Sequence, residues 1–310
     1  MPEDADRAAH PSPPSLARDV FALVKIGIVG SNALTAMAGF ALAAARFGRT
    51  GAARGAALWG AAALVFFGSS ALVAGSCALN NWIDRDIDGL MERTKRRPTA
   101  AGRIGRKTAL AAGLGLVGLG LALLSRLGPA PPLIGAAGVL IYVILYSLWA
   151  KRRTALSSFI GGVAGAIPPL VGWSAIDPRL GNAAWLLFAL LILWQQAHVR
   201  ALALRREREY GLAGLPMAGL HAPASDQRRR AERGLLLWVV ILLLFSPLLL
   251  PLGPPAAVAA AVLAAAWLGF GLALGRRTRR PGWAGLMFAA SLLYLVLVCA
   301  ALLLSSLASP

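Results

Sequence analysis

Long apolar runs, separated by short polar or Gly- and Pro-rich breaks, repeat along almost the whole chain. A helix needs about 20 consecutive apolar residues to cross the hydrocarbon core of a bilayer. Nine segments approach this length, at about 22–45, 55–79, 108–126, 131–149, 157–175, 183–203, 235–252, 256–274 and 284–307. The pattern therefore predicts an all-α membrane protein, a bundle of nine transmembrane helices.

The beginning of the chain lacks this pattern. Its first 20 residues are polar and Pro-rich, and they carry acidic groups where a secretory signal would carry basic ones. We expect residues 1–20 to form a flexible cytoplasmic tail. A single membrane domain is then predicted over residues 21–308.

Composition agrees with a membrane protein. Hydrophobic residues make up 58% of the chain and charged residues 14%, which excludes an ordinary soluble protein. The net charge of +18 alone would suit a nucleic-acid binder. The basic residues, however, lie in short runs between the apolar segments and are not interleaved with aromatic residues on a polar face. We therefore expect a lipid bilayer as the surroundings and no nucleic-acid partner.

Basic residues are divided unevenly between the two ends of the predicted spans. If the N-terminus is cytoplasmic, 26 of the 31 Lys and Arg residues lie on that side. Because cytoplasmic loops carry the excess of Lys and Arg, the N-terminus is predicted inside and the C-terminus outside. Both long polar loops, 80–107 and 200–233, then share the cytoplasmic face. The Ala- and Arg-rich composition is typical of a high-GC bacterium, which indicates the cell inner (plasma) membrane.

Three oxygen-bearing side chains follow the second span at helical spacing. Asn80, Asp84 and Asp88 lie four residues apart with no helix breaker before Gly89, so they are expected on one helix face. Two carboxylates one turn apart repel each other unless a cation lies between them. Oxygen ligands suit Mg²⁺, which completes its coordination with water and phosphate oxygens. The alternative is a solvated acidic helix end without a ligand.

A dense basic run comes directly after this motif, Glu92-Arg93-Thr94-Lys95-Arg96-Arg97-Pro98. Beside a carboxylate pair, such a run indicates a clamp for a diphosphate, because guanidinium groups and a metal ion can share its charge. An ordinary positive-inside anchor would explain the basic residues but not the carboxylates. Asp86 points off the shared face, and we expect it to pair with Arg85 or Arg93.

The run from Asn80 to Pro98, NNWIDRDIDGLMERTKRRP, resembles the signature of the haem O synthases, a branch of the UbiA prenyltransferase superfamily. Residues 146–154, 160–173 and 194–217 are similar to further loops and helices of that family, and the resemblance covers roughly residues 20–305. It implies a nine-helix bundle of the UbiA type and a prenyltransferase activity.

The family's reaction transfers a farnesyl group from farnesyl diphosphate to the vinyl group of haem B, with addition of water, and gives haem O. The resemblance therefore implies Mg²⁺ as cofactor, and farnesyl diphosphate and haem B as substrates. Haem A synthase or the assembly of a terminal oxidase are implied partners, since haem O is used in haem A biosynthesis.

The resemblance also implies roles for individual residues. Mg²⁺ would be held by Asn80, Asp84, Asp88 and Glu209. Catalytic roles are implied for Asp84, Asp88, Lys95, Arg97, His198 and Glu209. Substrate contacts are implied for Asn80, Arg93, Lys151, Arg152 and Tyr210. For Lys151 and Arg152 a positive-inside role is an equal alternative, and a histidine at a span end, such as His198, is as often satisfied by the backbone.

The second acidic motif departs from the family. Where the family usually carries Lys-Asp-Asp-Tyr, this chain reads Glu207-Arg208-Glu209-Tyr210, so one carboxylate survives but the pair does not. The first span begins Lys25-Ile26-Gly27 instead of Lys-Pro-Arg. Three functions are therefore open: a haem O synthase with a relaxed second site, a UbiA-type prenyltransferase with another acceptor, and a non-catalytic paralogue that binds haem or isoprenoid.

Overall fold

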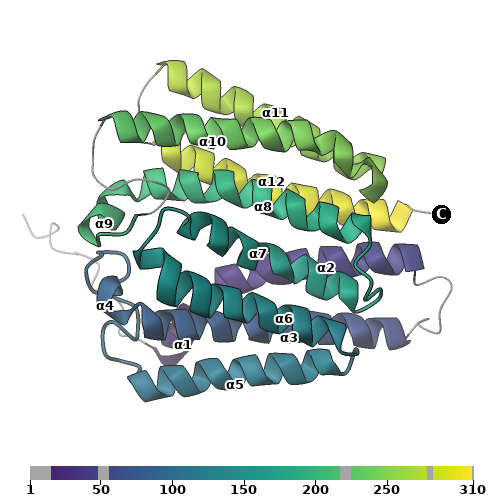
Figure 1. Cartoon of the computed structure of the whole chain (residues 1–310), viewed down its shortest axis with the longest axis horizontal. Helices are drawn as coiled ribbons and strands as arrows, with labels where there is room; N and C mark the ends of the chain where they lie inside the picture. The colour runs from purple at the N-terminus through teal and green to yellow at the C-terminus, as the bar shows by residue number, and fades with distance from the viewer. Residues whose placement is uncertain (1–14, 48–55, 217–224, 278–281, 309–310) are drawn as a thin grey trace, which may run out of the picture.

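The structure, a computed structural model, describes residues 15–47, 56–216, 225–277 and 282–308. Its elements in chain order are α1 (Leu16–Val24), α2 (Ile26–Phe47), α3 (Ala56–Ile83), α4 (Arg85–Asp88), α5 (Arg106–Ser125), α6 (Ala130–Leu140), η1 (Ile141–Trp149), η2 (Ala150–Arg152), α7 (Ser157–Ser174), α8 (Asn182–Arg205), α9 (Glu207–Leu212), α10 (Ser225–Phe245), η4 (Ser246–Leu252), α11 (Pro254–Arg277) and α12 (Trp283–Ala308). The described part of the chain is thus a bundle of helices, as the apolar pattern predicts (Figure 1).

Eight helical segments of the described residues are long and apolar enough to cross a membrane. They correspond to eight of the nine predicted spans. The remaining predicted span, 157–175, is the helix α7, whose Ser, Gly and Pro residues lower its hydropathy. Figure 1 shows α7 running alongside α8 between the same two ends of the bundle. The membrane bundle is confirmed, and the count of nine spans stays a prediction.

The start of the chain is more ordered than the tail prediction states. Helix α1 begins at Leu16, where the hydroxyl of Ser15 accepts a hydrogen bond from the backbone N–H of Arg18. The carboxylate of Asp19 then accepts hydrogen bonds of 2.8 to 3.1 Å from Arg103. Residues 16–20 are therefore helical, because a cap and an ion pair stabilise them. Residues 1–14 lie outside the described part.

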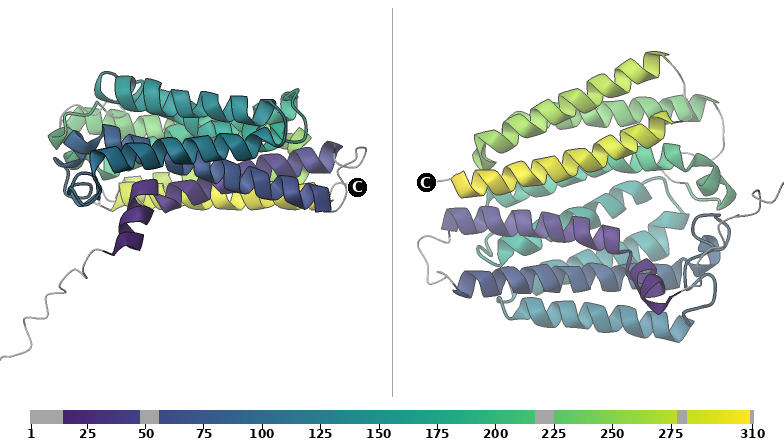
Figure 2. Two further views of the ribbon diagram at one scale, coloured as in Figure 1. Left: turned by 90° about the horizontal axis from the view of Figure 1, so that it is seen from below. Right: turned by 180° about the vertical axis from the view of Figure 1, so that it is seen from behind.

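The two predicted polar loops meet at one end of the bundle. Figures 1 and 2 show α4, α9 and the chain that follows α4 gathered at this end, whereas the C-terminus of α12 lies at the opposite end. The functional side chains predicted in both loops are therefore brought to the same end of the molecule.

Helices α2 and α7 are in backbone contact. A Cβ atom added at Gly39 would lie 2.1 Å from the carbonyl oxygen of Pro169, and one added at Gly172 would lie 1.9 Å from that of Ala36. Small residues at a membrane helix interface allow this close approach. The contact holds α2 and α7 as neighbouring walls of the interior described below.

We expect Gly172→Ala to destabilise the protein by about 1–3 kcal/mol, because the new methyl group must push α7 away from α2. Gly115→Ala is the matched control, since nothing lies within 4 Å of a Cβ atom at that position. Thermal unfolding of both variants in detergent measures the difference. Equal midpoints for the two variants would contradict the close contact.

Candidate active site

The predicted carboxylate ladder begins at the end of α3. The helix is interrupted at Asp84, whose φ of −85° and ψ of 5° are not helical, and the short helix α4 follows. The backbone N–H of Asp84 still donates to the carbonyl of Asn80 at 2.9 Å, and that of Asp88 donates to the carbonyl of Asp84 at 2.8 Å. The four-residue spacing therefore survives the break. All three side chains are buried, with 2%, 0% and 1% exposure in chain order.

The amide of Asn80 is the hub of a buried polar network. Its Nδ2 donates to Oδ2 of Asp84 at 2.8 Å and to the hydroxyl of Ser147 at 2.9 Å. Its Oδ1 accepts from the ammonium group of Lys25. Ser147 lies in η1, a π-helical stretch that continues α6, and such stretches are frequent at functional sites.

Each aspartate of the ladder is bound to a basic side chain. Lys151 donates to Oδ2 of Asp84. Arg97 donates to both oxygens of Asp88, at 2.9 and 2.8 Å. Lys151 and Arg97, which sequence reasoning places among the substrate-binding and catalytic residues, thus lie in direct contact with the predicted metal ligands. We call Asn80, Asp84, Asp88 and the cations bound to them the acidic cluster.

Lys25 is the member of the acidic cluster that sequence reasoning missed. It is the residue between α1 and α2, in the left-handed conformation with φ of 54°. Burial, and next the charge of Arg97, lower the pKa of Lys25 to about 8. The sequence signal is a lone lysine near the start of the first long apolar run, but its bond to Asn80 spans 55 positions and is visible only in the fold.

Three predicted basic residues lie outside the acidic cluster, and Arg152 is one of them. Arg152 donates to both oxygens of Asp86 at 2.6 and 2.7 Å, and also to the carbonyl of Ile83 at 3.1 Å. The expected pairing of Asp86 with Arg85 or Arg93 is therefore wrong, because η2 brings Arg152 against the helix break. The hydrogen bond from Arg152 also lowers the pKa of Asp86.

Lys95 pairs with Glu92 at 2.7 Å on the surface, where their side chains are 44% and 79% exposed. In this conformation it does not contact the aspartates of the acidic cluster. Its predicted catalytic role stays a prediction.

The altered second motif forms a separate ion network. Oε1 of Glu209 accepts from Arg206 at 2.7 Å, and its Oε2 lies 3.5 Å from Nε of Arg93. Within the described residues no three His, Cys, Asp or Glu side chains come together as metal ligands, so Glu209 does not form such a group with Asp84 and Asp88. Its predicted role as a metal ligand stays a prediction. What the structure shows is a link between the first polar loop and α9.

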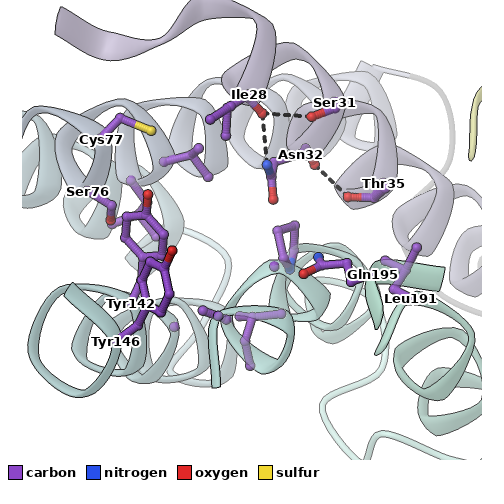
Figure 3. Close-up of a pocket in the computed structure, with 18 of the residues that line it drawn as sticks. Ile28, Ser31, Asn32, Thr35, Ser76, Cys77, Tyr142, Tyr146, Leu191 and Gln195 are labelled. Carbon is purple, nitrogen blue, oxygen red and sulfur yellow. Dashed lines mark hydrogen bonds between the residues drawn. The ribbon is translucent and has the colours of Figure 1, made fainter. Parts of the chain in front are cut away.

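A cavity of about 330 Å³ adjoins the acidic cluster (Figure 3). Cys77, one turn before Asn80, and Tyr146, the neighbour of Ser147, both line it, so the cavity begins beside the cluster. Tyr142 and Tyr146 are stacked with 5.5 Å between ring centres, and Tyr210 of α9 lines the same space. Further in, the walls include the apolar side chains of Leu72, Val73, Val139, Ile167, Val171 and Leu191. The volume falls in the range of small-molecule sites.

His198 lines this cavity from α8. Its ring is stacked on Trp194, with 4.8 Å between ring centres, and packs at 4.8 Å against Phe288 of α12. Its Nδ1 lies 2.7 Å from the hydroxyl of Ser291. The sequence alone located the histidine at a span end, but the partner from α12 could not be predicted.

The acidic cluster has the donors that a divalent cation requires. Oδ1 of Asp84 is buried and has no hydrogen-bond partner among the described residues. Carboxylate and amide oxygens are the ligands that Mg²⁺ prefers. The residues present therefore fit a cation held by Asp84 with Asn80 and Asp88.

Comparison with known proteins identifies the family of the chain. The model of the UbiA prenyltransferase family matches residues 32–293. The chain belongs to the UbiA prenyltransferase family. Protoheme IX farnesyltransferase of Alkalihalophilus pseudofirmus is 41% identical over 91% of this chain and 88% of its own length. Protoheme IX farnesyltransferase 2 of Bacillus subtilis is 39% identical over 94% of this chain and 92% of its own. These relatives confirm the branch that the first motif indicates, and the chain is a prenyltransferase.

Solved structures confirm the fold. A digeranylgeranylglyceryl phosphate synthase superposes with a TM-score of 0.69 at 18% identity, covering 94% of this chain and 98% of its own. A UbiA homologue from Archaeoglobus fulgidus, solved with GPP and Mg²⁺, superposes with a TM-score of 0.65 at 14% identity, covering 92% of this chain and 99% of its own. The bundle of this family member is therefore the UbiA membrane fold.

Lys151→Met should destabilise the protein by about 3–5 kcal/mol, because it leaves the charge of buried Asp84 without its ion-pair partner. Arg153→Met is the matched control, because Arg153 is exposed and lies two positions away. Thermal unfolding of the detergent-purified variants gives the comparison. A Lys151→Met protein as stable as the control would show that the ion pair does not stabilise the fold.

Proposed function

We propose that this protein transfers the farnesyl group of farnesyl diphosphate to a vinyl group of haem B, with addition of water and in the presence of Mg²⁺, and so produces haem O. The acidic cluster is the observation that supports a diphosphate substrate. It consists of two buried carboxylates bound to basic side chains beside an apolar cavity. The acceptor is inferred from the names of the relatives at about 40% identity.

The basic residues of the acidic cluster would bind the diphosphate. Bound Mg²⁺ would neutralise negative charge that develops on the departing diphosphate. Asn80, Asp84 and Asp88 would hold the ion, and Lys25, Lys151 and Arg97 would donate to phosphate oxygens. Arg93, held by Glu209 at the rim, adds a fourth cation on the side of α9.

The cavity would hold the isoprenoid chain. Its apolar walls exclude water from the allylic carbon, which protects the carbocation from early capture. The stacked rings of Tyr142 and Tyr146 lie at the end beside the acidic cluster, with Tyr210 of α9 lining the same cavity. Electron-rich ring faces near that carbon would stabilise positive charge as the bond to the diphosphate breaks. The vinyl group of the acceptor then provides the electrons for the new carbon–carbon bond.

We further propose the cell inner (plasma) membrane as the location, with the N-terminus and the acidic cluster on the cytoplasmic side and the C-terminus outside. The distribution of basic residues supports this orientation. Haem O is apolar enough to remain in the bilayer after release. Haem A synthase or terminal oxidase assembly is therefore the proposed destination of the product.

Replacing Asp84 by Asn should lower the rate of haem O formation by about 10²–10³, the range for loss of one strong electrostatic contact in a transition state. Asp86→Asn is the matched control, because Asp86 is largely exposed and bound to Arg152 outside the acidic cluster. Membranes are incubated with haem B, farnesyl diphosphate and Mg²⁺, and the extracted haems are separated by liquid chromatography and identified by mass spectrometry.

The Asp84→Asn protein should also unfold at a temperature close to that of the wild type, which shows that it is folded. Equal product from Asp84→Asn and wild type would contradict the metal assignment. Absence of any farnesylated haem from folded wild-type protein would contradict the proposed acceptor.

A further inference from the structure

His198 is held in one orientation by groups from two helices. Its ring lies against Trp194 of its own helix and Phe288 of α12, each with 4.8 Å between ring centres. The indole Nε1 of Trp194 donates to the carbonyl of Ser291 at 2.8 Å, and Nδ1 of His198 lies 2.7 Å from the hydroxyl of the same serine. These contacts fix both the plane of the imidazole ring and the partner of its Nδ1.

The hydroxyl of Ser291 fixes which ring nitrogen carries the proton. That hydroxyl donates its one hydrogen to the carbonyl of Phe288 at 2.5 Å. With its hydrogen directed to that carbonyl, the hydroxyl accepts from Nδ1 of His198, which assigns the hydrogen to Nδ1 and the free lone pair to Nε2. The neutral imidazole is thus arranged as a proton acceptor on its Nε2 side.

Two amide side chains that offer acceptor oxygens also line the cavity. The Nδ2 of Asn32 donates to the carbonyl of Ile28 at 2.8 Å, which leaves its Oδ1 as an acceptor that points into the cavity (Figure 3). Gln195, one helical turn from His198, lines the same cavity and also points into it (Figure 3). The amide oxygens of Asn32 and Gln195 can accept hydrogen bonds from a bound water molecule. The imidazole of His198 has a free lone pair that can take a proton from that water.

We propose that Nε2 of His198 is the base that removes a proton from the water added to the acceptor. This inference depends on the proposed function, in which the vinyl group is both farnesylated and hydrated. The bond between the allylic carbon and the diphosphate breaks, and the diphosphate leaves with the electron pair. The vinyl π electrons form the carbon–carbon bond and leave a cation on the carbon attached to the porphyrin. The water oxygen bonds to that carbon, and its proton passes to Nε2 of His198.

The base also decides which product forms. A cation of this kind that is not captured by water loses a proton from the neighbouring carbon and becomes an alkene. The alkene product is lighter than the hydrated one by the mass of one water molecule. His198, by activating water, favours hydration, so the ratio of the two products reports its role directly.

The test uses the full-length protein with haem B, farnesyl diphosphate and Mg²⁺ in water labelled with the heavy oxygen isotope. His198→Asn removes the free ring nitrogen and keeps a short side chain that can still donate to Ser291. We expect the hydrated, labelled product to form about 10²–10⁴ times more slowly, the usual range for loss of a general base. We also expect the alkene to make up a larger fraction of the remaining product.

Two further variants separate the base from its support. Ser291→Ala keeps the imidazole but removes the acceptor that fixes its tautomer, and it should slow hydration about tenfold, equivalent to one hydrogen bond. Leu292→Ala alters the exposed neighbour of Ser291, which lies outside the cavity lining, and should keep the wild-type ratio of products.

Wild-type product ratio and rate in His198→Asn would overturn the inference, although the proposed function would stand. The inference would also be overturned if His198→Asn changed the absorption spectrum of bound haem and reduced the hydrated product and the alkene equally. His198 would then be a ligand of the iron. Absence of farnesylated haem from wild-type protein would instead remove the proposed function on which the inference depends.

Discussion

The constraint on which the site depends is the burial of Asp84. A fully buried carboxylate is costly unless it is paired and hydrogen-bonded, and the cost rises at the edge of a membrane. Asp84 is tolerated because Lys151 and Asn80 bind its Oδ2. Asn80 is in turn fixed by Lys25 and Ser147. One charge thus ties together the junction of α1 and α2, the end of α3 and the π-helical end of the α6 segment.

This dependence explains irregularities that a regular helix bundle would not need. The left-handed backbone at Lys25 directs its ammonium group to Asn80. The π-helical stretch places Ser147 and, a few residues later, Lys151 beside the same ladder. Strained or unusual backbone is retained where the surrounding structure and the function require it. Both irregular segments contribute a side chain that binds Asn80, Lys25 in the first and Ser147 in the second.

Much of this could be predicted from the sequence. Apolar runs located the spans, and the four-residue spacing of Asn80, Asp84 and Asp88 placed them on one side even though the helix breaks at Asp84. Such local signals are carried by neighbours along the chain. The contacts of Lys25, Arg152 and Ser291 were not predictable, because each partner lies dozens of residues away and is brought near only by helix packing.

The second motif is best understood through charge. Without substrate, the acidic cluster contains the carboxylates of Asp84 and Asp88 and the cations Lys25, Lys151 and Arg97, so positive charge is in excess. The Glu209 network likewise has one carboxylate against Arg93 and Arg206.

A magnesium–diphosphate pair keeps a net negative charge, so an excess of cations on both sides favours its binding. Under the proposed function, Arg208 in place of an expected aspartate adds positive charge to α9, the direction that anion binding favours. What the second motif of this chain contributes in the structure is Glu209, which pairs with Arg93 of the first polar loop and with Arg206.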